Sequence, residues 1–187
     1  MLLLAPILAA CLAADASAAD AAAAPMAAVF ASKPTPFVEL GLGEFGFVGG
    51  QRQRDHVAAA VERTVQSLPG LFHDIARKRL TDANVIPRTV RISMDGDELV
   101  VVYGDNEPQR APLDGSTRKW RNPQGETNDL KHELHGSKLV QTTWGSGGRR
   151  VMVWSFDPER GLLRVQSTMS SPRLPEPVRY RLSFKAR

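Results

Sequence analysis

The sequence predicts a mainly β domain of the α+β class, in which two N-terminal helices precede an antiparallel meander of about eight strands. Apolar residues recur at helical spacing up to Pro87, and after Arg88 the spacing changes to every second residue. Short turn sequences separate the later segments, so no connection is long enough for the crossover that parallel strands need. The meander can close into a barrel or curve into a half-barrel.

The first 18 residues predict a signal for export. Residues 1–10 are apolar but too few to span a bilayer, which is typical of the hydrophobic part of a signal peptide. A site of small residues for cleavage ends at Ala18. The alternative is a lipoprotein signal that ends before Cys11, because Leu8–Cys11 resembles a lipobox and Cys11 would then carry the lipid.

Residues 19–36 are rich in alanine and proline and predict a tether, which leaves 37–187 as a single domain. Cys11 is the only cysteine, so the domain contains neither disulfides nor cysteine metal sites. The net charge is +4, but the basic residues are spread along the chain and do not form the patch that nucleic-acid binding uses. We expect a periplasmic or secreted protein without a nucleic-acid partner, which touches a membrane only through a lipid anchor.

Residues 51–68 predict the first helix, since Val57, Val61 and Val65 recur on one face. Pro69-Gly70 ends it. A second, shorter helix follows before Pro87, and five residues are expected to form its apolar face: Leu71, Phe72, Ile75, Ala76 and Leu80.

The strand half begins with Val90, Ile92 and Met94, which alternate with polar residues, and Asp95-Gly96 is a hairpin signal. Further turn sequences separate the remaining strands: Leu113–Gly115, Asn122–Gly125, His135–Ser137, Gly145–Gly148, Asp157–Gly161 and the proline-rich loop 170–177. The last strand follows that loop, and barrels of this size can hold a small ligand.

Turn geometry predicts which sheet face is the core. Pairing Gly145 with Gly148 places Leu139 opposite Trp154, and pairing Phe156 with Gly161 places Trp154 opposite Leu163. The core face then carries Leu139, Met152, Trp154, Phe156, Leu163 and Val165. The other face is only partly apolar, with Val140, Trp144, Val151 and Val153. We expect part of it to be covered, either by the helices or by a ligand or partner.

Two motifs suggest chemistry that their context excludes. Gly41–Val48 matches the dinucleotide-binding fingerprint, but that site needs a βαβ unit, so we interpret the segment as a glycine-rich link that packs aromatic residues. His132 and His135 are three residues apart in a strand, which predicts surface histidines on opposite faces and no metal site. The sequence also lacks a G-x-S-x-G elbow. We expect no catalytic site, no metal and no cofactor.

Aromatic side chains with a polar atom offer a ligand a large contact area. The residues expected to line a cavity are of this kind: Tyr103, Trp120, Trp144 and Trp154. On the last strand, Arg179, Arg181 and Lys185 share one face. They form either an anion-binding stripe, for lipid headgroups or an acidic polymer, or a solvated face that protects the strand against edge pairing.

Four segments of the strand half carry a resemblance to a known group of proteins: Asp95–Val101, Leu113–Gly115, Gly136–Val140 and Arg173–Val178. Over about residues 88–187 the chain resembles uncharacterised exported bacterial β proteins of the lipocalin-like kind. The resemblance implies no catalytic residues. We therefore expect an exported lipocalin-like module that binds a small hydrophobic or lipid ligand. The alternative is a structural or inhibitory protein of the cell envelope, which docks another protein through its partly apolar second sheet face.

Overall fold

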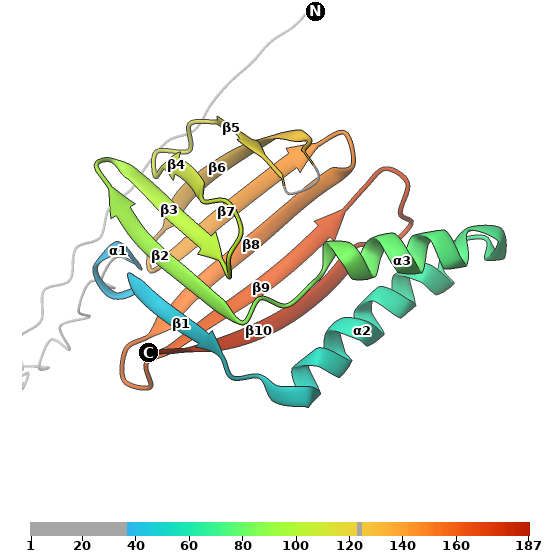
Figure 1. The fold of residues 1–187 in the computed structure, drawn as a ribbon, viewed down its shortest axis with the longest axis horizontal. Coiled ribbons are helices and arrows are strands. Elements are labelled where there is room, and N and C mark those ends of the chain that lie inside the picture. Colours follow the sequence, from blue (N-terminus) through green and yellow to red (C-terminus); the bar gives the residue numbers. More distant parts are fainter. Residues whose placement is uncertain (1–36, 123–124) are drawn as a thin grey trace, which may run out of the picture. The chain divides into compact units, whose positions relative to one another are not determined.

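A computed structural model describes residues 37–122 and 125–187, and Figure 1 shows their fold. Ten strands form one antiparallel sheet that curves into a nearly closed barrel. The strands are β1 (Gly43–Phe47), β2 (Thr89–Asp95), β3 (Glu98–Tyr103), β4 (Gln109–Pro112), β5 (Arg118–Arg121), β6 (Thr127–His135), β7 (Lys138–Gly145), β8 (Gly148–Asp157), β9 (Leu162–Ser170) and β10 (Val178–Ala186). The predicted helix-plus-barrel class is confirmed, with ten strands in place of about eight.

The sheet runs in the order β4-β3-β2-β1-β10-β9-β8-β7-β6-β5, so β4 and β5 are its two edges. These edges do not pair with each other along their length. The segment between them meets β6 instead, through a bridge between Asp114 and Glu133 and a hydrogen bond from Gly115 N to the carbonyl of His132 at 3.0 Å. Among the described residues, the backbone contact that closes the barrel is therefore short.

Strand β1 was missed in the sequence because its alternation is hidden by glycine. Gly43 and Gly46 have no side chains, so the apolar inner position is marked only by Phe45, which is 1% exposed, and by Phe47. β1 pairs with β2 on one side and β10 on the other, and it joins the two halves of the sheet. The glycine-rich segment is thus a central strand and not a link.

The register of β7, β8 and β9 places the predicted core face inside the barrel. Leu139 lies opposite Trp154, as the glycine turn predicts. Trp154 lies opposite Val165 and not Leu163, because the last pair of β8 and β9 is Asp157 with Leu162, so the turn lies one residue further along the chain than assumed. The difference is two residues, and a shift of two leaves every side chain on the face it had. The predicted set of core residues is therefore unchanged and packs into one cluster.

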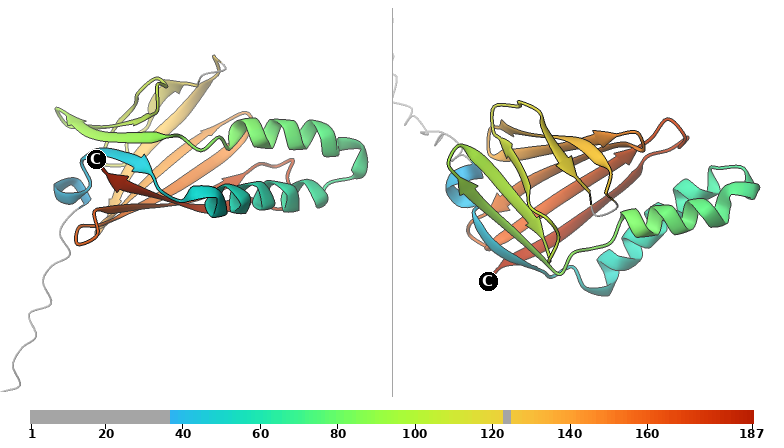
Figure 2. Two further views of the ribbon diagram at one scale, coloured as in Figure 1. Left: turned by 60° about the horizontal axis from the view of Figure 1, so that its bottom comes forward. Right: turned by 45° about the horizontal axis from the view of Figure 1, so that its top comes forward.

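In the described part of the chain three α-helices accompany the barrel: α1 (Phe37–Leu40), α2 (Gly50–Gln66) and α3 (His73–Ala83). The buried face of α2 carries Val57, Val61 and Val65, which join the barrel core. α3 lies against α2, where Arg77 forms a salt bridge with Glu62 at 2.9 Å. Figure 2 shows the two helices side by side and extending beyond the end of the barrel. None of the described helices is long and apolar enough to cross a bilayer.

The apolar face predicted for the second helix is largely wrong. Leu80 is buried, but Leu71, Phe72 and Ile75 are 87%, 52% and 59% exposed. Leu71 and Phe72 lie in the short 3₁₀ turn Gly70–Phe72 between α2 and α3, and Ile75 lies in the first turn of α3.

The helices also do not cover the outer sheet face, which was one expectation for them. The buried face of α2 contacts β10 and belongs to the same core cluster as Leu182, Trp154 and Leu163 on the inner face. On the outer face of β7 and β8, Val140 lies opposite Val153, and both are half-buried. The helix pair is therefore a cap for the end of the barrel.

The β7–β8 turn offers a matched pair of glycines for a stability test. A Cβ on Gly148 would lie 2.3 Å from the carbonyl oxygen of Ser170, and the residue has φ +139, whereas a Cβ on Gly147 would meet nothing within 4 Å. Gly148→Ala is expected to lower the free energy of unfolding by about 1–3 kcal/mol, and Gly147→Ala to leave it nearly unchanged. Urea unfolding measures both, and equal effects would contradict the turn geometry.

Candidate functional site

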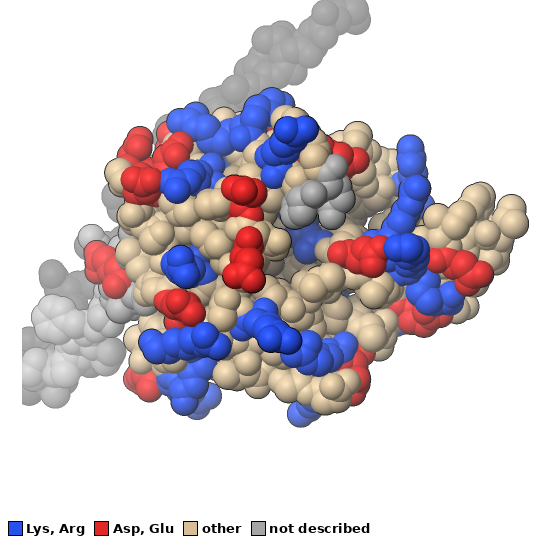
Figure 3. Space-filling model, viewed as in Figure 1, with Lys and Arg blue, Asp and Glu red and all other residues tan. Residues whose placement is uncertain are grey.

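A cavity of about 680 Å³ lies inside the barrel at the end where α3 and the following segment meet the strands. Figure 3 shows a hollow in this face of the molecule, with acidic and basic side chains along its edge. Residues Ala83 to Arg88 form one side of the mouth, and the β7–β8 turn at Gly147 and Gly148 forms another. The helix cap therefore limits access to the cavity.

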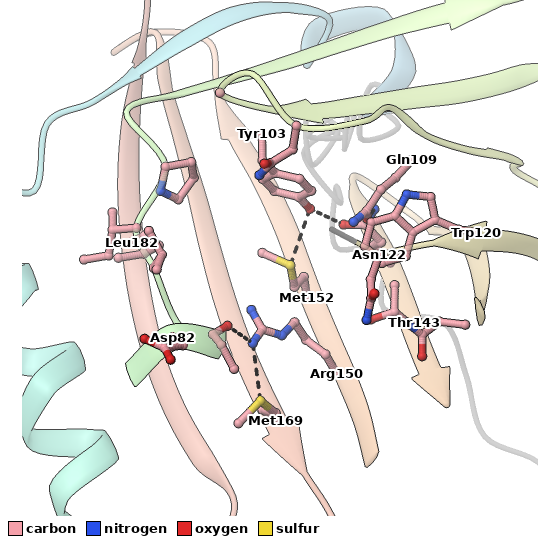
Figure 4. A pocket seen from close by; sticks show the side chains of 18 of the residues that line it. Asp82, Tyr103, Gln109, Trp120, Asn122, Thr143, Arg150, Met152, Met169 and Leu182 are labelled. Atoms are coloured by element: carbon pink, nitrogen blue, oxygen red, sulfur yellow. Dashed lines mark hydrogen bonds between the residues drawn. The ribbon is translucent and has the colours of Figure 1, made fainter. Parts of the chain in front are cut away.

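Much of the cavity wall is apolar and comes from inward positions of neighbouring strands. Met152 on β8, Met169 on β9 and Leu182 on β10 line it, as Figure 4 shows. Ile86 contributes from the segment between α3 and β2. Methionine side chains are flexible and adapt to ligands of irregular shape. The wall is suited to the apolar part of a small molecule.

The structure places all four predicted aromatic residues at this cavity: Tyr103, Trp120, Trp144 and Trp154. Tyr103 and Trp154 pack together, with ring centroids 6.0 Å apart. Trp154 is 0% exposed and packs within the cavity wall. Trp120 and Trp144 are half-buried, so part of each remains accessible. The indole N–H groups of Trp120 and Trp154 have no hydrogen-bond partner in the described part of the chain.

A network of uncharged polar groups forms one part of the wall. The Tyr103 hydroxyl donates to Gln141 Oε1, and Gln141 Nε2 donates to Gln109 Oε1 at 2.7 Å. Gln141 Nε2 also lies 3.1 Å from His132 Nε2. Burial raises the pKa of the Tyr103 hydroxyl, so it stays protonated and available as a donor. The network satisfies these groups largely among themselves.

His132 is part of this network and not a surface histidine, which corrects the sequence prediction. It is 0% exposed, and its Nδ1 lies 3.2 Å from the carbonyl oxygen of Ala111 on β4. Desolvation by burial lowers the pKa of His132 to about 4. His135, at the end of the same strand, is exposed. The described residues bring no three potential metal ligands together.

Arg150 is a cavity residue that sequence reasoning missed. It projects inward from β8 and lines the cavity near its mouth, where Nη2 donates to the carbonyl oxygen of Ala83 at 2.6 Å and to Asn84 Oδ1 at 3.2 Å. The sequence did contain a clue. Arg150 is two residues from Met152 and four from Trp154, so strand alternation places it on the same core face as both. Its position two residues after a turn hid its role.

The remaining predicted site residues lie elsewhere. Arg179, Arg181 and Lys185 are exposed on β10, alternating with the buried Tyr180, Leu182 and Phe184. They face away from the cavity, and their role as an anion-binding stripe stays a prediction. Cys11, the predicted lipidation site, lies outside the described residues.

Comparisons with known proteins bear on the fold. No family model matches the chain, and no curated protein is significantly similar to it in sequence. Among solved structures, the wild-type fluorescent protein UnaG has a TM-score of 0.50 at 17% identity, covering 80% of this chain and 99% of its own. The apo form of Caenorhabditis elegans lipid binding protein 8 has a TM-score of 0.53 at 13% identity, covering 82% and 99%.

These likenesses establish the architecture. The chain shares a β-barrel fold with these two proteins. The neighbours are not exported bacterial proteins in particular, so that part of the predicted resemblance stays a prediction.

Proposed function

We propose that this chain is an exported binding protein that holds a small, largely apolar molecule in the barrel cavity and has no catalytic activity. The observation that carries the proposal is the cavity of about 680 Å³, bounded by the strands and by the helix cap. Its size is within the range of ligand pockets, and its inward wall is rich in methionine and aromatic residues. The likeness to a protein that is itself named as lipid binding supports this class of ligand.

The absence of catalysis is supported by the state of the groups at the cavity. The buried imidazole of His132 is the group that would be considered first as a general base. Both of its nitrogens lie within hydrogen-bonding distance of protein atoms, Ala111 O and Gln141 Nε2. Tyr103 donates to Gln141. These partners are an amide side chain and a backbone carbonyl, so the contacts assemble no nucleophile–base pair.

Binding is tested with a neutral fluorescent probe, N-phenyl-1-naphthylamine, whose emission rises in apolar surroundings. We expect saturable binding to the wild type. Met152→Trp fills the cavity from β8 and is expected to weaken binding at least about 10-fold, which corresponds to about 1.4 kcal/mol. The matched control is Val153→Trp, the neighbouring position on the outer face, which is expected to bind as the wild type does.

Melting temperatures of both variants show that each is folded. Equal loss of binding in the two variants, or no binding to the wild type, would contradict the proposal that the cavity is the site.

The second candidate is a cell-envelope protein that docks a protein partner through the outer face of β7 and β8. The specific observation in its favour is the half-buried apolar surface formed by Val140, Val151 and Val153 on the outer face. Val153→Glu separates the two proposals, because it is expected to abolish partner binding and to leave probe binding intact.

Export is tested by the intact mass of the protein recovered from the producing cells. A mass that begins after Ala18 supports cleavage and release, and a diacyl or triacyl adduct on Cys11 supports a lipid anchor. An unprocessed chain in the cell interior would contradict both.

A further inference from the structure

Arg150 occupies an inward position where apolar or neutral side chains are its neighbours. It lies opposite Thr143 on β7 and opposite Met169 on β9, and Met152 follows it on the inner face of β8. It is half-buried at the mouth of the cavity. Figure 4 shows the guanidinium reaching across the mouth toward the end of α3.

The charge of Arg150 has no counter-ion in the described part of the chain. Its hydrogen bonds run to a backbone carbonyl and to the Asn84 amide, and the thioether of Met169 lies 3.3 Å from Nη2. Asp82, the acidic residue beside Ala83 in α3, pairs instead with Lys78 at 2.8 Å. A partly desolvated cation without a counter-ion raises the free energy of the empty site, and a ligand anion would lower it.

The geometry also leaves donors free for a ligand. All three contacts of the guanidinium involve Nη2, so Nε and Nη1 donate to no group among residues 37–122 and 125–187. Each of these two donors can make a charge-assisted hydrogen bond to a carboxylate or phosphate oxygen. Because Ala83 and Asn84 hold Nη2, the group is fixed before a ligand arrives, which reduces the entropy that binding costs.

Deeper in the cavity the wall offers no charge. Tyr103, Gln109 and Gln141 are neutral and hydrogen-bonded to each other, and the neighbouring wall is formed by Leu182 and Phe184. An ionised group would lose its hydration there without gaining a counter-ion. The position of the charge therefore fixes the direction in which an amphiphile enters.

We propose that the ligand is an anionic amphiphile, whose apolar end lies deep in the barrel and whose carboxylate or phosphate binds Arg150 at the mouth. This inference rests on the proposed binding function and adds the charge and the orientation of the ligand. The lining also carries three carboxylates, those of Asp82, Asp105 and Glu126, and the guanidinium groups of Arg88 and Arg149. The test therefore includes a cationic amphiphile.

The experiment compares three probes with the same tail: dodecanoate, dodecanol and dodecyltrimethylammonium. Each is used below its micelle concentration, and calorimetry measures its affinity. We expect dodecanoate to bind at least about 10-fold more tightly than dodecanol, and the cation to bind most weakly. In Arg150→Gln, dodecanoate and dodecanol are expected to bind equally, with the affinity for dodecanol unchanged.

The matched control is Arg179→Gln, which removes one positive charge from the outside of β10 and is expected to keep the preference for dodecanoate. Failure of all three probes to bind would contradict the proposed function itself. Equal binding of dodecanoate and dodecanol to the wild type would leave that function standing and overturn the inference. So would an equal loss of both affinities in Arg150→Gln, because Arg150 would then serve only to hold α3.

Discussion

Replacing Trp154 with alanine is expected to lower the free energy of unfolding by about 3–5 kcal/mol, the usual cost of removing a large buried aromatic side chain. Trp154 is 0% exposed and lies between Leu139 and Val165 on the inner face of the barrel. It also packs against Tyr103, which belongs to the polar network of the cavity wall. Its loss enlarges the cavity and removes support from that network.

Two further variants show which part of the side chain matters. Trp154→Phe keeps an aromatic ring and removes an indole N–H that has no hydrogen-bond partner in the described chain, so we expect a loss of only about 1–2 kcal/mol. Trp144→Ala removes a half-buried tryptophan at the end of β7 and is expected to cost about 1 kcal/mol.

Urea unfolding at neutral pH measures all three. If Trp154→Ala cost no more than Trp144→Ala, the closely packed inner face described here would be wrong.

The inner face of β7, β8 and β9 could be predicted because two local signals agree there. Side chains alternate strictly along a strand, and the glycine turn fixes the partner of Leu139. Even the wrong β8–β9 turn did no harm, since an error of two residues preserves the faces. In β1 this alternation cannot be recognised, because glycine occupies one inward and one outward position. The sequence of this central strand therefore did not indicate a strand.

The helix cap could not be placed from its own pattern. The periodicity of α2 predicts an apolar face but not its partner, and the inner core and the outer sheet face were both apolar enough to receive it. For α3 the apolar pattern was misleading, because Leu71, Phe72 and Ile75 are exposed in the structure. Where a helix ends relative to a barrel depends on contacts distant in sequence, which periodicity does not contain.

The residues of the candidate site could also be predicted only in part. Large aromatic residues were found by type alone, and the structure brings all four to one cavity. Polar residues were misassigned, because a buried polar side chain is recognised by its partners and these come from distant strands. His132 meets the carbonyl oxygen of Ala111 only because the barrel closes between β4 and β6. Arg150 likewise meets Ala83 and Asn84 only because the helix cap returns to the mouth.

The burial of His132 predicts that the protein loses stability in mild acid. The pKa of His132 is lowered from 6.5 to about 4 in the folded state, chiefly by desolvation. The unfolded chain then binds a proton that the folded chain resists, so stability is full above about pH 6.5 and falls as the pH drops toward 4. The shift corresponds to about 3 kcal/mol in all, of which about 2 kcal/mol is lost between about pH 7 and pH 5.

The measurement is the free energy of urea unfolding of three proteins at these two pH values. His132→Gln retains an amide that can bond to its neighbours but removes the titration, so its stability is expected to be lower at neutral pH and to change little on acidification. His135→Gln replaces an exposed histidine on the same strand and is expected to keep the acid sensitivity of the wild type.

Comparing the wild type with His132→Gln separates the effect of His132 on the pH dependence of stability from the effects of other titrating groups. The pKa values of Glu62, Asp114 and Glu133 are lowered by hydrogen bonds and nearby cations, and carboxylates of this kind lose their stabilising effect only in stronger acid. Glu98 opposes the main effect, since its negative charge raises the pKa of His132, but desolvation is the larger cause. Equal acid sensitivity in the wild type and His132→Gln would therefore mean that β4 does not cover His132, and that the barrel is open where the structure closes it.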